Sequence, residues 1–176
     1  MTGTTRREGD GEAAIRPIAA GDADLVFDFF QSLSERTKYY FHPYKFTREE
    51  AEHLAGAGLA DRDRPAYMAT LREDGGEKMV GHVFFWQWTN KVPWLGIAVR
   101  DGYQELGLGR KLMAYAVDAV KAAGKGGILL TTMQDNERAQ ALYKRMGFSI
   151  IGTSPEGELL LILNLPDESM GELLTR

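Results

Sequence analysis

Residues 99–112 read VRDGYQELGLGRKL and join an apolar segment, residues 94–99 (WLGIAV), to a long amphipathic helix. The helix is predicted from Leu108 onward, because apolar side chains recur at helical spacing up to Ala123. The first turn of a helix has backbone N–H groups without partners and carries a partial positive charge. Glycines in the preceding loop let a ligand approach the backbone closely. The stretch therefore predicts a cradle for a phosphate group, with Arg110 as a nearby cation.

Two well-known phosphate-binding motifs do not fit this loop. The Walker A motif needs Lys after its second glycine, whereas Leu108 follows Gly107 here. The dinucleotide fingerprint needs a third glycine at position 112, which is Leu. On the glycines alone, a simple turn before an ordinary helix is therefore an alternative interpretation.

Outward from this stretch, the hydrophobic periodicity predicts the element order βααβββαβαββ. Strands are expected at residues 14–18, 66–71, 79–88, 94–99, 128–133, 148–153 and 159–165. Helices are expected after a cap at Asp22, after the capping box Thr47–Glu50, from Leu108 to Gly124, and from a cap at Asp135 or Asn136 to Gly147. The aromatic residues 38–44 are expected to form a connection between the first two helices. Helices between strands, together with hairpins, predict a mixed sheet with helices on both faces.

Composition limits the classes of protein that fit. The chain has 176 residues, a formal net charge of −4 and no cysteine. One domain is expected over residues 14–176, after a flexible leader at residues 1–13. The lack of cysteine excludes disulfides, Cys-ligated metals and a thiol nucleophile. The acidic balance argues against nucleic acid as a partner. No apolar run approaches the about 20 residues of a membrane span, and the N-terminal residues have no secretory pattern, so the expected location is the cytoplasm.

Two motifs resemble one known family. Residues 104–109 (QELGLG) have the form Q/R-x-x-G-x-G/A, and residues 136–148 (NERAQALYKRMGF) have the form N-x-x-A-x-x-L-Y-x-x-x-G-F. In this order and spacing they resemble motifs A and B of the GCN5-related N-acetyltransferases, the GNAT superfamily. The resemblance implies an α/β (α+β mixed) fold, in which a mostly antiparallel seven-stranded sheet is flanked by about four helices. It also implies acetyl-CoA as the acyl donor, bound where two parallel strands, residues 94–99 and 128–133, splay apart.

The resemblance also assigns roles to individual residues. The backbone of Ile97, Ala98 and Val99 would pair with the pantetheine arm, and Gly96 would match a β-bulge in this strand or be a small core residue. The N–H groups of the loop and first helical turn would hold the pyrophosphate, over Glu105, Leu106, Gly107, Leu108, Gly109 and Arg110, while Gln104 shapes the turn. Asn136 would lie near the CoA arm or cap its helix. Tyr143 would be the general acid that protonates the CoA sulfur, or else an aromatic side chain of the core.

The resemblance gives no general base. Some family members carry a Glu five residues before the motif B Asn, but Thr131 stands at that position here. Candidates from the sequence are His82, His42 and Glu105, and direct loss of the proton to water is the alternative. The three histidines show no metal-ligand spacing, so no metal is expected.

The resemblance implies that the acceptor is bound between the first strand and the second helix and by later loops. Aromatic side chains gather in the first of these regions and in the strand expected at residues 79–88. The first region contains residues 39–44 (YYFHPY). In the other, strand alternation is expected to place Phe84, Trp86 and Trp88 on one face and Phe85 on the opposite face, with Trp94 nearby. These side chains are expected to line an acceptor site, unless they only fill the core.

The sequence therefore predicts an N-acetyltransferase that acts on the primary amine of a small molecule of the amino acid, amino sugar or polyamine type. Acetylation of a protein N-terminus or lysine is the alternative within the same family. A non-catalytic module that binds acyl-CoA is the alternative of another class. The partners expected are acetyl-CoA and an amine, without nucleic acid or membrane, in a monomer or homodimer.

Overall fold

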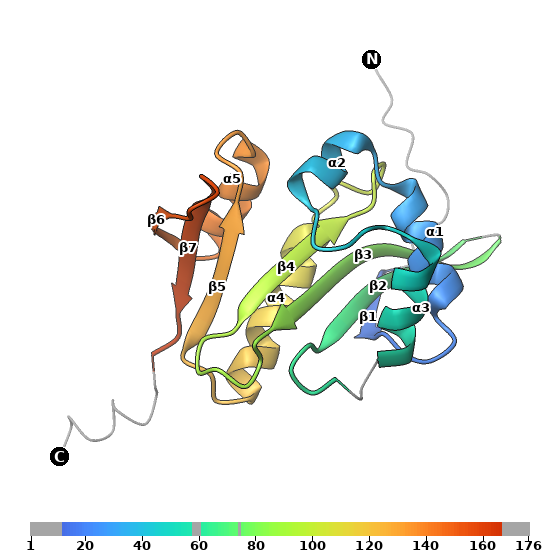
Figure 1. Ribbon diagram of the computed structural model, residues 1–176, viewed down its shortest axis with the longest axis horizontal. Helices are drawn as coiled ribbons and strands as arrows, with labels where there is room; N and C mark the ends of the chain where they lie inside the picture. The colour runs from blue at the N-terminus through green and yellow to red at the C-terminus, as the bar shows by residue number, and fades with distance from the viewer. Residues whose placement is uncertain (1–11, 58–60, 74, 167–176) are drawn as a thin grey trace.

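A computed structural model describes residues 12–57, 61–73 and 75–166. Within them the chain forms one seven-stranded sheet with the strand order β1-β2-β3-β4-β5-β7-β6 (Figure 1). The strands are β1 (Ala14–Pro17), β2 (Ala66–Glu73), β3 (Gly76–Trp86), β4 (Trp94–Val99), β5 (Gly127–Thr132), β6 (Ser149–Thr153) and β7 (Leu159–Asn164). Neighbouring strands are antiparallel except for β4 and β5. The predicted mixed, mostly antiparallel seven-stranded sheet is confirmed.

Helices cover both faces of the sheet, as predicted. On one face lie α1 (Ala23–Ser32) and α3 (Arg48–Ala57), which share a core with Met68 and Phe84. On the other face lies α4 (Leu108–Ala122), which packs with α5 (Glu137–Arg145) against Val83 and Phe85. Because consecutive strand residues point to opposite faces, β3 contributes to both cores. The sheet therefore separates two cores, and Figure 1 shows α4 behind β4 and part of β3, with α3 in front of β1 and β2.

The parallel pair β4–β5 is the weakest junction of the sheet. It contains one registered residue pair, Trp94 with Leu129, and the Leu129 N–H donates to the Pro93 carbonyl at 2.9 Å. In the described part of the chain no further pair joins these two strands, whereas β4 pairs with β3 along all its length. Figure 1 shows β4 and β5 diverging toward their carboxyl ends. The inner edges of both strands are thus left without a strand partner, which agrees with the predicted splay.

Several local expectations were wrong. A fifth helix, α2 (Glu35–Tyr40), occupies part of the segment expected to be a connection, and the Ser34 side chain caps it by accepting from the Thr37 N–H. Strand β3 begins at Gly76, three residues earlier than expected. It ends at Trp86, because Gln87 has φ 53° and breaks the extended backbone. This break places Trp88 against Phe85, on the face opposite to Trp86.

Gly96 shows no bulge in its pairing with β3. The register between β3 and β4 runs without a shift through the pair Phe84–Gly96. A Cβ atom at Gly96 would lie 2.3 Å from Cε1 of the Phe84 ring, so the ring fills the space that a side chain would need. Close packing of this aromatic ring therefore explains the glycine.

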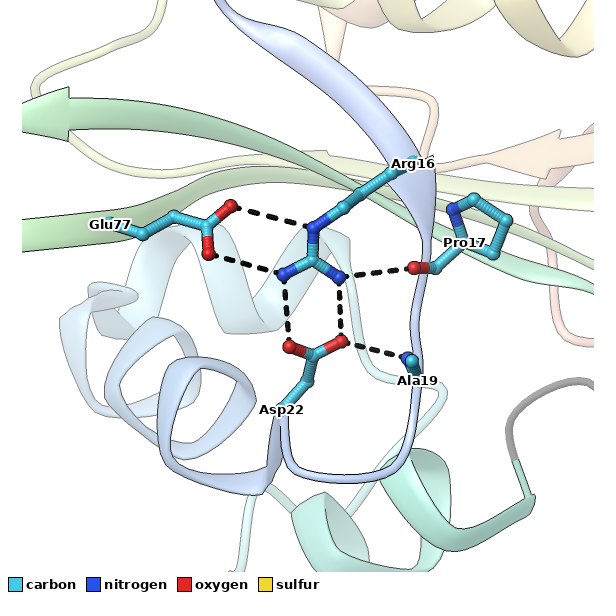
Figure 2. A network of polar contacts seen from close by, with 5 residues as sticks. All are labelled: Arg16, Pro17, Ala19, Asp22 and Glu77. Atoms are coloured by element: carbon cyan, nitrogen blue, oxygen red, sulfur yellow. Dashed lines mark hydrogen bonds and ion pairs between the residues drawn. The ribbon is translucent and has the colours of Figure 1, made fainter.

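Asp22 precedes α1 as expected, but its side chain does not cap the helix. Its carboxylate accepts two hydrogen bonds from the Arg16 guanidinium, at 2.7 and 2.9 Å, and one from the Ala19 N–H at 2.8 Å (Figure 2). Arg16 also donates to Glu77 on β3. This network joins β1, the start of α1 and β3, and the bonds from Arg16 hold the pKa of Asp22 below its ordinary value.

We expect Asp22→Asn to lower the free energy of unfolding by about 1–2 kcal/mol at neutral pH, since it removes a charged partner of Arg16. A carboxyl pKa that is lower in the folded chain stabilises the fold above its unfolded value of about 3.9, and this contribution is lost as the pH falls through the folded value. The difference between wild type and variant should therefore narrow in acid, as measured by urea unfolding. Asp118→Asn, on the exposed side of α4, is the control; an equal effect of both variants would contradict a special role for the Arg16 network.

Candidate functional site

The loop between β4 and α4 has an unusual backbone. Gly102, Glu105 and Gly107 all have positive φ values, of 85°, 65° and 82°. Gly107 occupies the N-cap position of α4, and no side chain caps the helix there. The first intrahelical bond runs from the Lys111 N–H to the Gly107 carbonyl. The N–H groups of Leu108, Gly109 and Arg110 therefore have no intrahelical acceptor, as a helix start requires.

Hydrogen bonds to β4, α2 and α5 hold this loop in place. Gln104 donates from Nε2 to the Val99 carbonyl at 2.9 Å and to Thr37 Oγ1 at 3.3 Å. Asp101 accepts from the N–H and hydroxyl groups of Ser34 and from the Thr37 hydroxyl, at 2.9–3.0 Å. Arg138, on α5, donates to Gln104 Oε1 and, at 3.2 Å, to Glu105 Oε1. The loop is thus tied to α2 on one side and to α5 on the other.

These contacts also keep the Asp101 carboxyl ionised. Burial opposes ionisation of Asp101, but the bonds from Ser34 and Thr37 outweigh it and lower the pKa of this carboxyl. Arg138, Ser34 and Thr37 were not among the predicted site residues. Arg138 occupies a variable position of motif B, so only its place in the first turn of a helix beside the loop could have indicated it.

Tyr143 projects from α5 into the core beside α4. It is 6% exposed, and its ring centroid lies 5.8 Å from that of Phe148. Burial raises the pKa of Tyr143 well above its ordinary value. The phenol is therefore protonated at neutral pH and is able to act as a proton donor.

The other residues predicted to bind the acyl donor lie on β4 and at the start of α5, beside the gap where β4 and β5 diverge. Ile97, Ala98 and Val99 form the end of β4, where the edge that faces β5 is unpaired. The Val99 carbonyl is already occupied by Gln104. Asn136 caps α5 by accepting from the Ala139 N–H at 3.3 Å. The loop, the edge of β4 and the start of α5 thus meet at one end of the sheet, as Figure 1 shows for their elements.

The candidate bases lie in different surroundings. His82 is fully buried, with Nδ1 2.9 Å from the Tyr67 carbonyl oxygen and Nε2 3.2 Å from the Tyr44 hydroxyl. Burial lowers the pKa of His82 to about 4, so the ring is neutral at pH 7. His42 is exposed and contacts the Tyr39 carbonyl through Nδ1. Glu105 is exposed and paired with Arg138. The structure does not bring these three residues together.

A row of rings lines the other face of the sheet. His82 stacks on Phe84, Phe84 on Trp86, and Trp86 on Trp94, with centroid distances of 5.1, 5.6 and 5.8 Å. Beside this row lies a pocket of about 230 Å³. It is lined by Pro43, Tyr44, Glu50, His53, Leu54, Ala57, Asp61, Arg64, Ala66, Phe84 and Trp86. The expected aromatic acceptor region is therefore divided, since Phe41 is buried, Tyr39 is exposed on α2, and Trp88 lies on the opposite face.

The described residues contain neither a membrane-spanning helix nor a group of side chains suited to a metal ion. No helix there is long and apolar enough to cross a bilayer, and no three His, Asp or Glu side chains are grouped so that they could hold a metal ion.

Comparison with known proteins identifies the family. The profile of the acetyltransferase (GNAT) family matches residues 27–148, and the chain belongs to this family. Streptothricin acetyltransferase of Streptomyces lavendulae is 30% identical over 119 residues, which are 63% of this chain and 62% of that protein. The chain thus matches less than two thirds of the length of this relative.

Solved structures show the same fold. The ribosomal-protein-S5-alanine acetyltransferase of Vibrio fischeri superposes with a TM-score of 0.77 at 16% identity, over 89% of this chain and 95% of the other. The spermidine N-acetyltransferase of Vibrio cholerae, solved with CoA and spermine, gives a TM-score of 0.71 at 17% identity, over 87% and 95%. At these identities the likeness concerns the fold alone, and the two proteins are named for different acceptors.

We expect the imidazole of His82 to remain neutral down to a pH of about 4, because burial opposes its protonation. In the unfolded chain the ring binds a proton from about pH 6.5 downward, so the folded protein should lose stability as the pH falls from 6.5 toward 4. The chemical shift of the His82 Cε1 proton, followed by NMR against pH, measures this directly. A midpoint near 6.5 would show that water reaches the ring, and would restore His82 as a candidate base.

Proposed function

We propose that this protein transfers the acetyl group of acetyl-CoA to the primary amine of a small molecule. The observation that carries the proposal is the parallel pair β4–β5, which ends after one residue pair and opens beside the uncapped N-terminus of α4. A strand edge without a partner offers backbone N–H and C=O groups to an extended ligand, and a helix start offers N–H groups to phosphate. The pantetheine arm and pyrophosphate of CoA have these two chemistries in one molecule.

The donor would be bound by residues that the structure has already ordered. The N–H groups from Glu105 to Arg110 would hold the pyrophosphate, and Gly107 leaves open space at the position of a Cβ. The free edge of Ile97 and Ala98 would pair with the pantetheine amides. An N–H group near the thioester oxygen would stabilise the negative charge that develops there.

The transfer itself requires three changes at the thioester. The amine nitrogen forms a bond to the acetyl carbon, the carbon–sulfur bond breaks, and the thiolate takes a proton. In this mechanism Tyr143 is the donor for this proton, since its phenol is neutral at pH 7. The ammonium proton of the acceptor is lost to water in this mechanism, because both ring nitrogens of His82 have partners and Thr131 has no basic group.

The pocket beside the aromatic row favours a small acceptor. It lies under α3, where aromatic rings and charged side chains enclose about 230 Å³. The relative named for streptothricin supports a small-molecule acceptor. The spermidine N-acetyltransferase, solved with spermine, is a protein of the same fold that binds a small amine. The proposal includes the cytoplasm as the place of action. A panel of amines, protein N-termini and lysine peptides, assayed by release of free CoA thiol, separates a small-molecule enzyme from a protein acetyltransferase and from a module that only binds acyl-CoA.

We expect CoA to raise the thermal midpoint of the wild type, because a ligand that binds only the folded chain stabilises it. Gly107→Glu should abolish this shift by placing a negative side chain in the cradle. Gly124→Glu is the matched control, because Gly124 also has a positive φ and open space but lies at the opposite end of α4. Thermal unfolding with and without millimolar CoA measures the effect. The cradle is disproved if the wild type shows no shift or if both variants lose it equally.

We expect Tyr143→Phe to lower kcat by about 10²–10⁴, the range typical of a lost general acid. The ring and its contact with Phe148 remain, so the affinity for CoA should change little. Steady-state turnover with a preferred amine, combined with the thermal shift by CoA, separates the two effects. Unchanged turnover under conditions where chemistry limits the rate would assign Tyr143 to packing alone.

A further inference from the structure

The pocket under α3 contains charged side chains that form no ion pair with the other residues the structure describes. Glu50 and Arg64 both line it, and neither forms an ion pair with another described residue. Asp61 also lines it, and one of its carboxylate oxygens accepts from the Asp63 N–H at 3.1 Å. The carboxylates therefore outnumber the guanidinium in the pocket, and Glu50 has its charge available for a ligand.

His82 determines the direction of the hydrogen bond that the Tyr44 hydroxyl forms. The Tyr67 carbonyl can only accept, so Nδ1 of His82 carries the proton and Nε2 has the lone pair. Tyr44 must then donate its hydroxyl proton to Nε2, across 3.2 Å. Any ligand that contacts the Tyr44 oxygen therefore meets an acceptor and has to supply a donor. Burial keeps this phenol protonated by raising its pKa; the field of Glu50 adds to the rise and that of Arg64 opposes it.

The remaining walls are aromatic. Phe84 and Trp86 line the pocket together with Tyr44, and the rings of Tyr44 and Phe84 are 5.3 Å apart. Faces of aromatic rings attract cations. A hydrogen-bond acceptor, an unpaired carboxylate and three rings in one small pocket together match an organic ammonium group.

The pocket shares one wall, the Phe84 ring, with β4, which is one of the two strands that flank the opening. The Phe84 ring that forms one wall also covers Gly96 on β4, the strand whose far edge is unpaired. One aromatic ring thus separates the pocket from the backbone of this strand.

We propose that this pocket binds a second, non-reacting ammonium group of the acceptor, so that the preferred substrates are diamines or larger amines with two basic groups. The proposal rests on the proposed function, because it assigns the substrate class of the same reaction. The bound group is not the one that reacts, since a carboxylate such as Glu50 favours the protonated nitrogen, which has no lone pair for attack. Glu50 supplies the counter-charge, Tyr44 accepts a hydrogen bond, and Phe84 and Trp86 surround the alkyl chain.

The test compares putrescine with butylamine and γ-aminobutyrate, which have similar chains but differ in the second group. In the wild type we expect kcat/KM for putrescine to exceed that for butylamine by about tenfold, the factor that one cation–π contact with a nearby counter-charge supports. Glu50→Gln should reduce this ratio to about one, and Arg64→Gln should increase it. Glu49→Gln is the matched control, because it removes the same charge from the adjacent residue, which is exposed and does not line the pocket.

A second readout does not depend on turnover. Calorimetric binding of putrescine to the CoA-loaded protein should weaken in Glu50→Gln and in Tyr44→Phe, and should be unchanged in Glu49→Gln. If acetyl transfer occurs but the ratio is the same in all variants, or if γ-aminobutyrate is preferred and Arg64→Gln weakens it, the pocket proposal is overturned while the acetyltransferase stands. If putrescine binds in a Glu50-dependent way but no thiol is released with any amine, the pocket is supported and the proposed function fails.

Discussion

The candidate site depends on one constraint, the early end of the pairing between β4 and β5. Backbone N–H and C=O groups at a protein surface need partners, and each β-strand normally finds them in its neighbours. Here β3 satisfies one edge of β4 and β7 satisfies one edge of β5, so both remaining edges face each other without pairing. The loop before α4 and the first turn of α5 lie at this open end and add further unpaired donors and charges. In the proposed function, acetyl-CoA, which has an extended arm and an anionic pyrophosphate, would complete these bonds.

Much of the fold follows from local sequence signals. Buried strands and amphipathic helices repeat at periods of 2 and 3.6 residues, and the bounds predicted for residues 94–99 agree with the structure. The cap at Asn136 and the bond from the Glu50 N–H to the Thr47 hydroxyl were also predictable, because a cap joins residues only a few positions apart. The motif at residues 104–109 located the turn before α4, in which Gly107 is the N-cap and Leu108 and Gly109 already belong to the helix.

The errors concern features that hydrophobic periodicity and capping patterns do not contain. Asp22 has a strong partner in Arg16, six residues away and on another element, and this pairing replaces the helix cap. Trp88 changes face because Gln87 adopts a left-handed backbone that alternation does not predict. His82 was a reasonable base in the sequence, but only the assembled sheet places it between Tyr44 and Tyr67 in the core. For Tyr143 and the loop, the structure gives the positions, burial and hydrogen bonds, and their roles in acetyl transfer belong to the proposed function.

The separation of the two cores has a consequence for how such a protein changes over evolution. The loop before α4 leads into a helix whose apolar side chains belong to one core. The side chains around the pocket pack with α1 and α3 in the other core. Substitutions on opposite faces share few contacts, so their effects on stability should add independently. Mutations that reshape the acceptor side can accumulate without repacking α4, and a lineage is then free to acquire new acceptors while its donor chemistry stays constant.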